Sequence, residues 1–149
     1  WVYGPFGANF VKTMLRLADA RDEVGVVGDQ SGNPTSALDL ADVVIAVAQH
    51  LVDGSDVRHR GIFHAAGKGE GTWADLAEIV FAASAANGGP SAHVNRIATV
   101  DYPTPARRPA NSRLNCTALF ERHGVSFPDW RVSAAAVTAR LLHEKATMA

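Results

Sequence analysis

The stretch VGVVGDQSGNPTSALDLADVVIAVAQHL, residues 24–51, decides the fold class. Its first residues, Val24 to Val27, are mostly β-branched and end at Gly28-Asp29, which is typical of a short buried strand. Residues 30–36 have no hydrophobic period and carry Gly, Asn and Pro, so we expect a loop there. From Leu38 to Leu51, apolar residues fill most of the helical surface, which predicts a helix covered on more than one side. A strand, a loop and a helix in this order form the unit from which α/β proteins are built.

The rest of the chain continues this alternation. Apolar segments bounded by turn residues predict three further strands, at 1–3, 61–66 and 94–100, the second of them buried. Cap residues and 3.6-residue apolar periods predict four further helices, which begin at Asn9, Thr72, about Asn115 and just after Asp129. We therefore expect the α/β class.

Two of these helices have specific boundary signals. Thr72 is followed three residues later by Asp75, a variant of the capping box that satisfies free backbone N–H groups at a helix start. The short helix after Asn115 is expected to stop at Gly124, because glycine readily adopts the backbone conformation that ends helices.

Composition excludes several classes of protein. The chain has 149 residues, 47% of them hydrophobic, and 14 Lys plus Arg against 15 Asp plus Glu give a net charge of -1. A balanced charge argues against a nucleic-acid partner or a polybasic membrane patch, and no apolar run approaches the ~18 residues of a membrane span. The single cysteine, Cys116, cannot form an internal disulfide and reads as a small core residue, so we expect a cytoplasmic location.

The beginning of the chain is unusual for a complete domain. An apolar, strand-like segment starts at Trp1 with no Met and no polar lead-in. We therefore expect a piece of a longer protein, whose first strand has lost its sheet neighbours.

Two features that often form metal or anion sites are interpreted as structural in this sequence. The six histidines show no His–His pair at the helical spacing that would bring two imidazoles to one ion, so we expect no metal site. The loop Gly67 to Gly71 precedes a helix N-terminus, where anions bind well. Its glycines alternate strictly, however, and lack the spacing of a phosphate-binding loop, so we interpret it as a surface turn.

Two loops are stronger candidates for a binding site. Residues 102–113, YPTPARRPANSR, present three arginines on a backbone stiffened by proline, and the planar guanidinium suits phosphate oxygens. The alternative is a solvated loop whose arginines pair with surface acids, and both interpretations stay open. Residues 29–35 follow a strand directly, and in open α/β sheets ligands lie outside the carboxyl ends of strands.

The motifs of the chain, taken in order, resemble those of the dTDP-4-dehydrorhamnose reductase family. They are WVYG at 1–4, NF at 9–10, GNPT at 32–35, TW at 72–73, YPTPARRP at 102–109 and NSRLN at 111–115. The order is collinear and covers almost the whole chain. The two runs between 102 and 115 make the resemblance specific.

This family belongs to the extended short-chain dehydrogenase/reductases. The resemblance implies a doubly wound, Rossmann-like parallel sheet with a small α/β substrate-binding lobe. It also implies NADPH-dependent reduction of the 4-keto group of dTDP-4-dehydro-L-rhamnose, which gives dTDP-L-rhamnose for cell-surface polysaccharide.

The catalytic part of the family pattern is absent from the sequence. In the family, a Tyr of a Y-x-x-x-K motif donates the proton to the carbonyl oxygen. Neither Tyr3 nor Tyr102 has a Lys four residues later, and the Gly-rich cofactor fingerprint is also missing. Residues 1–149 therefore resemble only the C-terminal, substrate-binding part, with no catalytic residue, and NADPH would be bound mainly by an N-terminal part.

The resemblance also assigns positions around the substrate. It places Trp1 beside the deoxysugar, Asn9 and Phe10 beside the nucleotide sugar, and Gln30 and Pro34 in the nucleotide pocket. The segment with Arg107, Arg108 and Asn111 is the candidate for the diphosphate, with no choice between the two arginines.

Two alternatives to the reductase remain open at this stage. One is a non-catalytic binding or regulatory relative of the same fold, and the other is an epimerase or dehydratase that acts on another nucleotide sugar. The sequence also leaves a homodimer open, and it does not specify the base or the sugar of the substrate.

Overall fold

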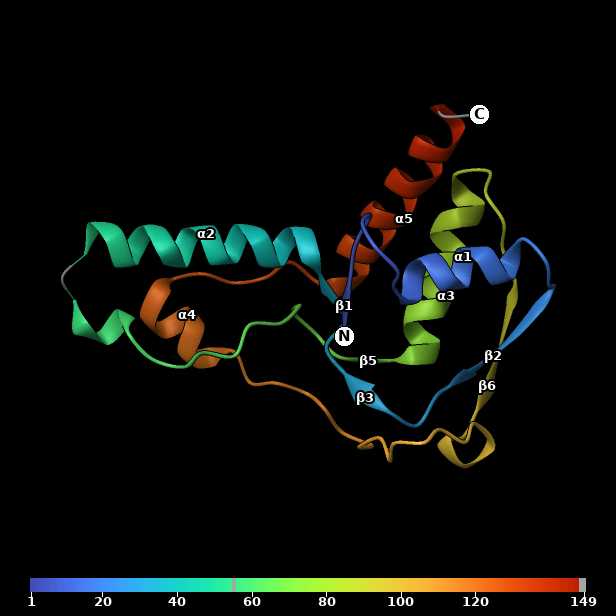
Figure 1. Ribbon diagram of the computed structural model, residues 1–149, viewed down its shortest axis with the longest axis horizontal. Coiled ribbons are helices and arrows are strands. Elements are labelled where there is room, and N and C mark those ends of the chain that lie inside the picture. The colour runs from blue at the N-terminus through green and yellow to red at the C-terminus, as the bar shows by residue number, and fades with distance from the viewer. Residues whose placement is uncertain (55, 148–149) are drawn as a thin grey trace.

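The computed structural model describes residues 1–54 and 56–147 (Figure 1). Its elements are β1 (Val2–Tyr3), α1 (Phe10–Ala18), β2 (Glu23–Val27), β3 (Ser31–Gly32), β4 (Thr35–Ser36), α2 (Ala37–Asp53), η1 (Val57–His59), β5 (Gly71–Thr72), α3 (Trp73–Ala86), β6 (His93–Ile97), η2 (Thr99–Asp101), α4 (Thr117–His123) and α5 (Trp130–Thr147).

Short strand pairs and covering helices make this an α/β structure, as predicted. β1 pairs with β4 and β2 with β6, both in parallel, while β3 and β5 are antiparallel. The parallel pairs follow from the helices that connect their strands, because a parallel partner needs a long crossover. β1 was expected to lack sheet neighbours, but Val2 and Tyr3 pair with Thr35 and Ser36.

The main core lies where α1, α3 and α5 meet and α1 and α3 pack against β2 (Figure 1). Trp130, 1% exposed, begins α5 and lies within this core. The Tyr3 hydroxyl donates to the backbone carbonyl of Trp130 at 3.1 Å. The indole Nε1 of Trp130 donates to the Glu70 carbonyl, also at 3.1 Å. The backbone and side chain of Trp130 together therefore join β1 and the Gly-rich loop, residues 67–71, to α5.

The helix boundaries confirm the local signals in the sequence. The Asn9 side chain accepts from the backbone N–H of Lys12 at the start of α1. Thr72 and Asp75 form a complete capping box at the start of α3. Gly124 ends α4 with a φ of 64°, which is the left-handed region that glycine tolerates.

Three expectations about the middle and end of the chain were wrong. Residues 30–36, expected as a loop, include the two short strands β3 and β4. Residues 61–66, expected as a buried strand, form no strand, and Ile62 is 97% exposed. A strand needs a neighbour for its backbone groups, and no described strand pairs with this segment. The last predicted strand ends at Ile97, because 99–101 form the turn η2.

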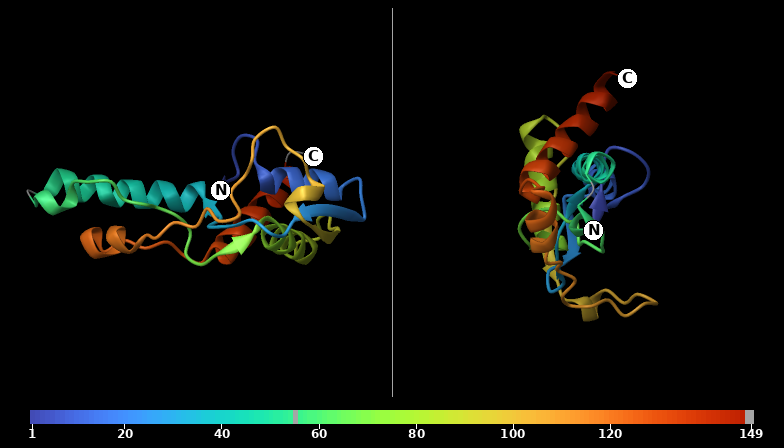
Figure 2. Two further views of the ribbon diagram at one scale, coloured as in Figure 1. Left: turned by 90° about the horizontal axis from the view of Figure 1, so that it is seen from below. Right: turned by 90° about the vertical axis from the view of Figure 1, so that its left-hand side faces the viewer.

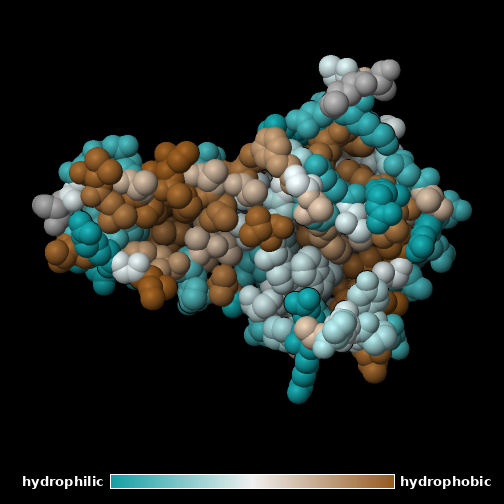
Figure 3. Space-filling view, viewed as in Figure 1, coloured by the Kyte–Doolittle hydropathy of each residue, from teal (hydrophilic) through white to brown (hydrophobic). Residues whose placement is uncertain are grey.

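α2 is also more exposed than its sequence predicted. Of its 17 residues only Val43 is buried, whereas Ile45 is 66% and Val52 81% exposed. With η1 and α4 it forms an arm that projects from the body of the molecule (Figures 1 and 2). The surface of this arm carries extensive apolar patches (Figure 3). A second, smaller core of Val43, Leu119 and Phe127 joins α2 to α4 and to the loop after it.

In the part of the chain that the structure describes, no helix combines the length and the apolar character needed to cross a bilayer.

Candidate functional site

Three aromatic rings gather at the start of α3. Trp1 stacks on Trp73 with ring centroids 3.8 Å apart and planes inclined by 11°, and Phe10 lies 4.9 Å from Trp73 in a tilted arrangement. Trp73 is the first residue of α3 and follows the N-cap Thr72 directly, so the capping box fixes the position of its backbone. All three side chains are half-buried, so they form a partly accessible aromatic platform.

Gln30 connects this platform to the turn η2. Its Oε1 accepts from Trp73 Nε1 at 3.3 Å, and its Nε2 donates to Thr99 Oγ1 at 3.0 Å. Gln30 is only 8% exposed. Both ends of the amide therefore have partners, which holds the side chain at the edge of the platform.

Gly32 allows Trp1 to lie flat against β3. A Cβ on this residue would lie 2.5 Å from Trp1 Cε2 and 2.7 Å from Cζ2, which are distances that real side chains do not show. Glycine is required here for close approach rather than for its backbone angles.

We expect Gly32→Ala to displace the Trp1 ring from Trp73 because the added methyl group takes its space. The result should be a weaker near-ultraviolet circular dichroism signal from the stacked indoles. Gly25→Ala is the matched control, since a Cβ there would meet Ile97 at an ordinary 3.6 Å. An unchanged spectrum for Gly32→Ala would show that the ring does not depend on this contact.

Residues 29–31 fasten both ends of the arginine-bearing loop, 102–110. At its start, the Asp29 carboxylate accepts from the Thr99 backbone N–H at 3.0 Å and from the Thr99 hydroxyl at 2.6 Å. These hydrogen bonds lower the pKa of Asp29. At its end, the Ser31 N–H donates to the Ala110 carbonyl and the Ser112 N–H donates to the Ser31 carbonyl, both at 2.8 Å. The loop between these anchors projects from the body (Figure 2, right).

The three arginines of this segment have different surroundings. Arg113 forms an ion pair with Glu70 and bonds Asn111 Oδ1, so the surface-pairing interpretation holds for this residue. Arg107 and Arg108 are exposed, and neither guanidinium has an ion pair or hydrogen bond with a described residue. Asn111, at the anchored end, forms an isolated β-bridge with Ser31. Two guanidinium groups thus remain available beside an anchored backbone.

Asn9 and Pro34 have structural roles in this arrangement. Besides capping α1, Asn9 donates through Nδ2 to the Gly4 carbonyl at 2.8 Å. Pro34 is fully buried, and its carbonyl lies against Gly67 so closely that a Cβ on Gly67 could not fit. The structure thus brings Trp1, Phe10 and Gln30 together, while Asn9 and Pro34 fix the backbone beside them.

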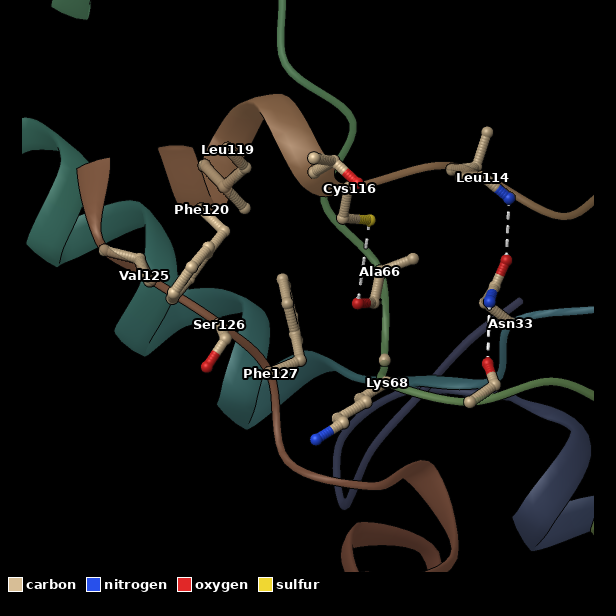
Figure 4. Close-up of a pocket in the computed structure, with 13 residues that line it drawn as sticks. Asn33, Ala66, Lys68, Leu114, Cys116, Leu119, Phe120, Val125, Ser126 and Phe127 are labelled. Carbon is tan, nitrogen blue, oxygen red and sulfur yellow. Dashed lines mark hydrogen bonds between the residues drawn. The ribbon is translucent and has the colours of Figure 1, made fainter. Parts of the chain in front are cut away.

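A cavity of about 370 Å³ lies beside this loop system, between the Gly-rich loop and α4 (Figure 4). Asn33 stands on one wall, where Nδ2 donates to the Gly69 carbonyl and Oδ1 accepts from the Leu114 N–H, both at 2.7 Å. Leu119 and Phe120 of α4 line another wall. Cys116 is half-buried at the rim, not in the core as expected.

Sequence reasoning missed three residues of this site. Trp73 and Asn33 appear in the sequence analysis only within the motifs TW and GNPT, with no role at the site, and Thr99 was expected as part of a strand. The tryptophan directly after a helix cap was a usable signal, since a first-turn side chain lies beside the preceding loop. Thr99 and Asn33 bond residues 70 and 81 positions away, which no local pattern indicates.

Comparison with known proteins assigns the chain to a protein family. Residues 1–143 match the family described as RmlD substrate binding domain. The chain belongs to this family. This chain is similar to the "dTDP-4-dehydrorhamnose reductase" of Sinorhizobium fredii. The two are 46% identical over 144 residues, which are 97% of this chain and 49% of that protein.

Two solved structures resemble this RmlD substrate binding domain closely. A dTDP-4-dehydrorhamnose reductase from Clostridium acetobutylicum superposes with a TM-score of 0.83 at 35% identity, over 95% of this chain and 46% of the other. The Bacillus anthracis enzyme, in complex with NADP, gives a TM-score of 0.79 at 30% identity, over 94% and 46%. The chain therefore spans about half the length of these relatives and has the C-terminal portion of their fold.

Proposed function

We propose that this RmlD substrate binding domain is the substrate-binding part of an NADPH-dependent reductase. That enzyme would reduce the 4-keto group of dTDP-4-dehydro-L-rhamnose and release dTDP-L-rhamnose. The observation that carries the proposal is the match to this family over 143 residues, with 46% identity to a protein named as this reductase.

Residues 1–149 do not themselves fit the cofactor or the proton donor. Tyr3 is 2% exposed, and its pKa is raised, first by burial and then by Asp39 and Asp129. A tyrosine that donates a proton near neutral pH needs the opposite shift. In the Gly-rich loop, the Lys68 N–H already donates to the Pro128 carbonyl, and Gly67 lies against Pro34. We therefore assign the cofactor site to another part of the enzyme.

The described residues support a substrate role. We propose that Trp1 and Phe10 flank the sugar, since flat rings suit its apolar face, and that Asn9 holds the backbone at this point. Gln30, Pro34 and the loop around them would form the nucleotide pocket. Arg107 and Arg108 would bind the diphosphate, with Asn111 anchoring their loop, because unpaired guanidinium groups match phosphate oxygens.

We further propose that the cofactor-binding part packs on the arm. α2 exposes apolar residues along its length, and the extended segment 61–66 has no described strand beside it. The arm belongs to the region that superposes on a reductase chain about twice as long. A neighbouring strand and an apolar surface would complete the sheet and cover α2, which agrees with what its sequence predicts.

Turnover by the full-length protein tests this function. With NADPH and the 4-keto sugar, we expect oxidation of the cofactor and formation of dTDP-L-rhamnose, whereas the 149-residue chain alone should show neither. Cofactor consumption without this product would favour action on another nucleotide sugar. No turnover, under conditions in which the Sinorhizobium fredii relative works, would favour a non-catalytic relative.

A further inference from the structure

Three histidines from separate elements meet at the tip of the arm. His50 near the end of α2, His59 of η1 and His123 at the end of α4 have ring centroids 5.1 to 5.8 Å apart. Phe63 closes one side with its ring edge-on to His123 at 4.9 Å. The candidate substrate site does not include these residues.

Four ring nitrogens of this cluster are buried and have no hydrogen-bond partner among the described residues. His123 is 4% exposed, and both of its nitrogens, together with Nδ1 of His50 and Nδ1 of His59, find no hydrogen-bond partner among the described residues. Burial without a partner is costly for a polar atom and more so for a charged one. The described part of the chain holds no group of His, Cys, Asp or Glu arranged for a metal ion, so a metal does not explain the cluster.

The surroundings of His123 disfavour its proton. Burial lowers the pKa of His123, and the neighbouring His59 and His50 lower it further, although the His59 carbonyl slightly opposes them. Charged and titratable side chains on the surrounding segments are Asp53 on α2, Asp56 and Arg58 at η1, Arg60 and His64 beyond it, and Glu121 and Arg122 on α4. The Asp56 carboxylate, beside His59, is paired with Arg58.

The cluster lies where α4 packs against α2 and η1 within the arm. η1 contacts α4, and the apolar cluster of Val43, Leu119 and Phe127 lies along the same helices. Leu119 and Phe120 of α4 also form a wall of the cavity (Figure 4). The position of α4 therefore determines how closed the cavity is.

We propose that His50, His59 and His123 form a proton-operated latch that holds α4 against α2 and η1 at neutral pH and releases it in mildly acidic solution. Two or three positive charges at these separations repel one another and need water. Release of α4 separates the wall with Leu119 and Phe120 from the wall with Asn33 and opens the cavity.

The sign of the effect follows from proton linkage. The folded arm binds a proton on His123 less readily than the open form, in which a histidine has a pKa of about 6.5. The closed form is therefore fully favoured above that value and loses stability as the pH falls below it. For each proton that the closed form excludes, the equilibrium constant between the closed and open forms changes by about tenfold per pH unit as the pH falls below this value.

Cys116, directly before α4, is a built-in probe of release. Its Sγ lies 4.0 Å from the Ala66 carbonyl across the cavity rim, and it is the single cysteine of the chain. Labelling of the 149-residue chain with a pyridyl disulfide would be compared with the same chain in urea at each pH, which removes the intrinsic pH dependence of the thiol. We expect the ratio of the two rates to rise about tenfold or more from about pH 7.5 to about pH 5.5, with the helical circular dichroism retained.

Two variants decide whether the histidines cause the change. His123→Phe keeps an aromatic ring against Phe63 but cannot be protonated, so its ratio should vary much less with pH; His50→Phe replaces it if that variant does not fold. His93→Gln, on the exposed strand β6, should respond as the unmodified chain does. A flat response of the unmodified chain, an unaltered response in both Phe variants, or loss of all helical signal together with labelling would overturn the latch.

Discussion

Replacing Trp130 with alanine is expected to lower the free energy of unfolding by about 3–5 kcal/mol, the usual cost of removing a large buried aromatic ring. Trp130 is 1% exposed in the main core and donates through Nε1 to the Glu70 carbonyl. Its removal leaves a cavity where α5 meets the Gly-rich loop, and the Glu70 carbonyl loses the indole donor and keeps only the Arg131 guanidinium at 3.2 Å. Urea denaturation followed by circular dichroism measures the change.

Two further variants separate packing from hydrogen bonding at this position. Trp130→Phe fills most of the space but cannot donate, so it should cost less than Trp130→Ala, with about 1 kcal/mol due to the lost hydrogen bond. Val132→Ala, on the same helix but 66% exposed, should change little. If Val132→Ala cost as much as Trp130→Ala, the assignment of the core to Trp130 would be wrong.

Removing both Arg107 and Arg108 is expected to weaken dTDP binding to the full-length protein by about 2 kcal/mol or more, roughly 30-fold in Kd. Both guanidinium groups are exposed and lack described partners, so the unliganded loop loses no contact when they are removed. The cost should therefore appear in binding and not in stability. Calorimetric titration with dTDP measures it, and the single variants show which arginine contributes more.

Arg113→Ala is the matched control because it removes the same charge from the same segment. Arg113 is paired with Glu70, and an exposed ion pair contributes little to stability or to binding elsewhere. We expect its Kd for dTDP to change by no more than about threefold. Equal affinities for the double variant and the unmodified protein would return Arg107 and Arg108 to the interpretation as a solvated loop.

Local signals in the sequence correctly predicted the helix starts that depend on hydrogen bonds between residues close together in the chain. Asn9 caps α1 and Thr72 with Asp75 caps α3, because each bond joins residues only three positions apart. The prolines between 102 and 109 exclude regular structure from that loop, as found. The family also follows from sequence, since its motifs run collinearly through almost the whole chain.

The apolar character of two segments was recognised correctly, but their burial was predicted wrongly. The segment 61–66 and the helix α2 have the composition of buried elements, yet they lie on the surface of the arm. Burial is a property of what covers an element, and the chain spans about half the length of its relatives.

The contacts that assemble the candidate site and the histidine cluster were decided by the tertiary structure alone. Trp1 and Trp73 are 72 positions apart, and His50 and His123 are 73 apart, yet both pairs of rings are in contact. The tertiary structure also separated Arg113, paired with Glu70, from Arg107 and Arg108, which have no partner among the described residues, although all three look alike in sequence. Periodicity and capping report contacts within a few residues along the chain, whereas these contacts depend on how distant segments pack.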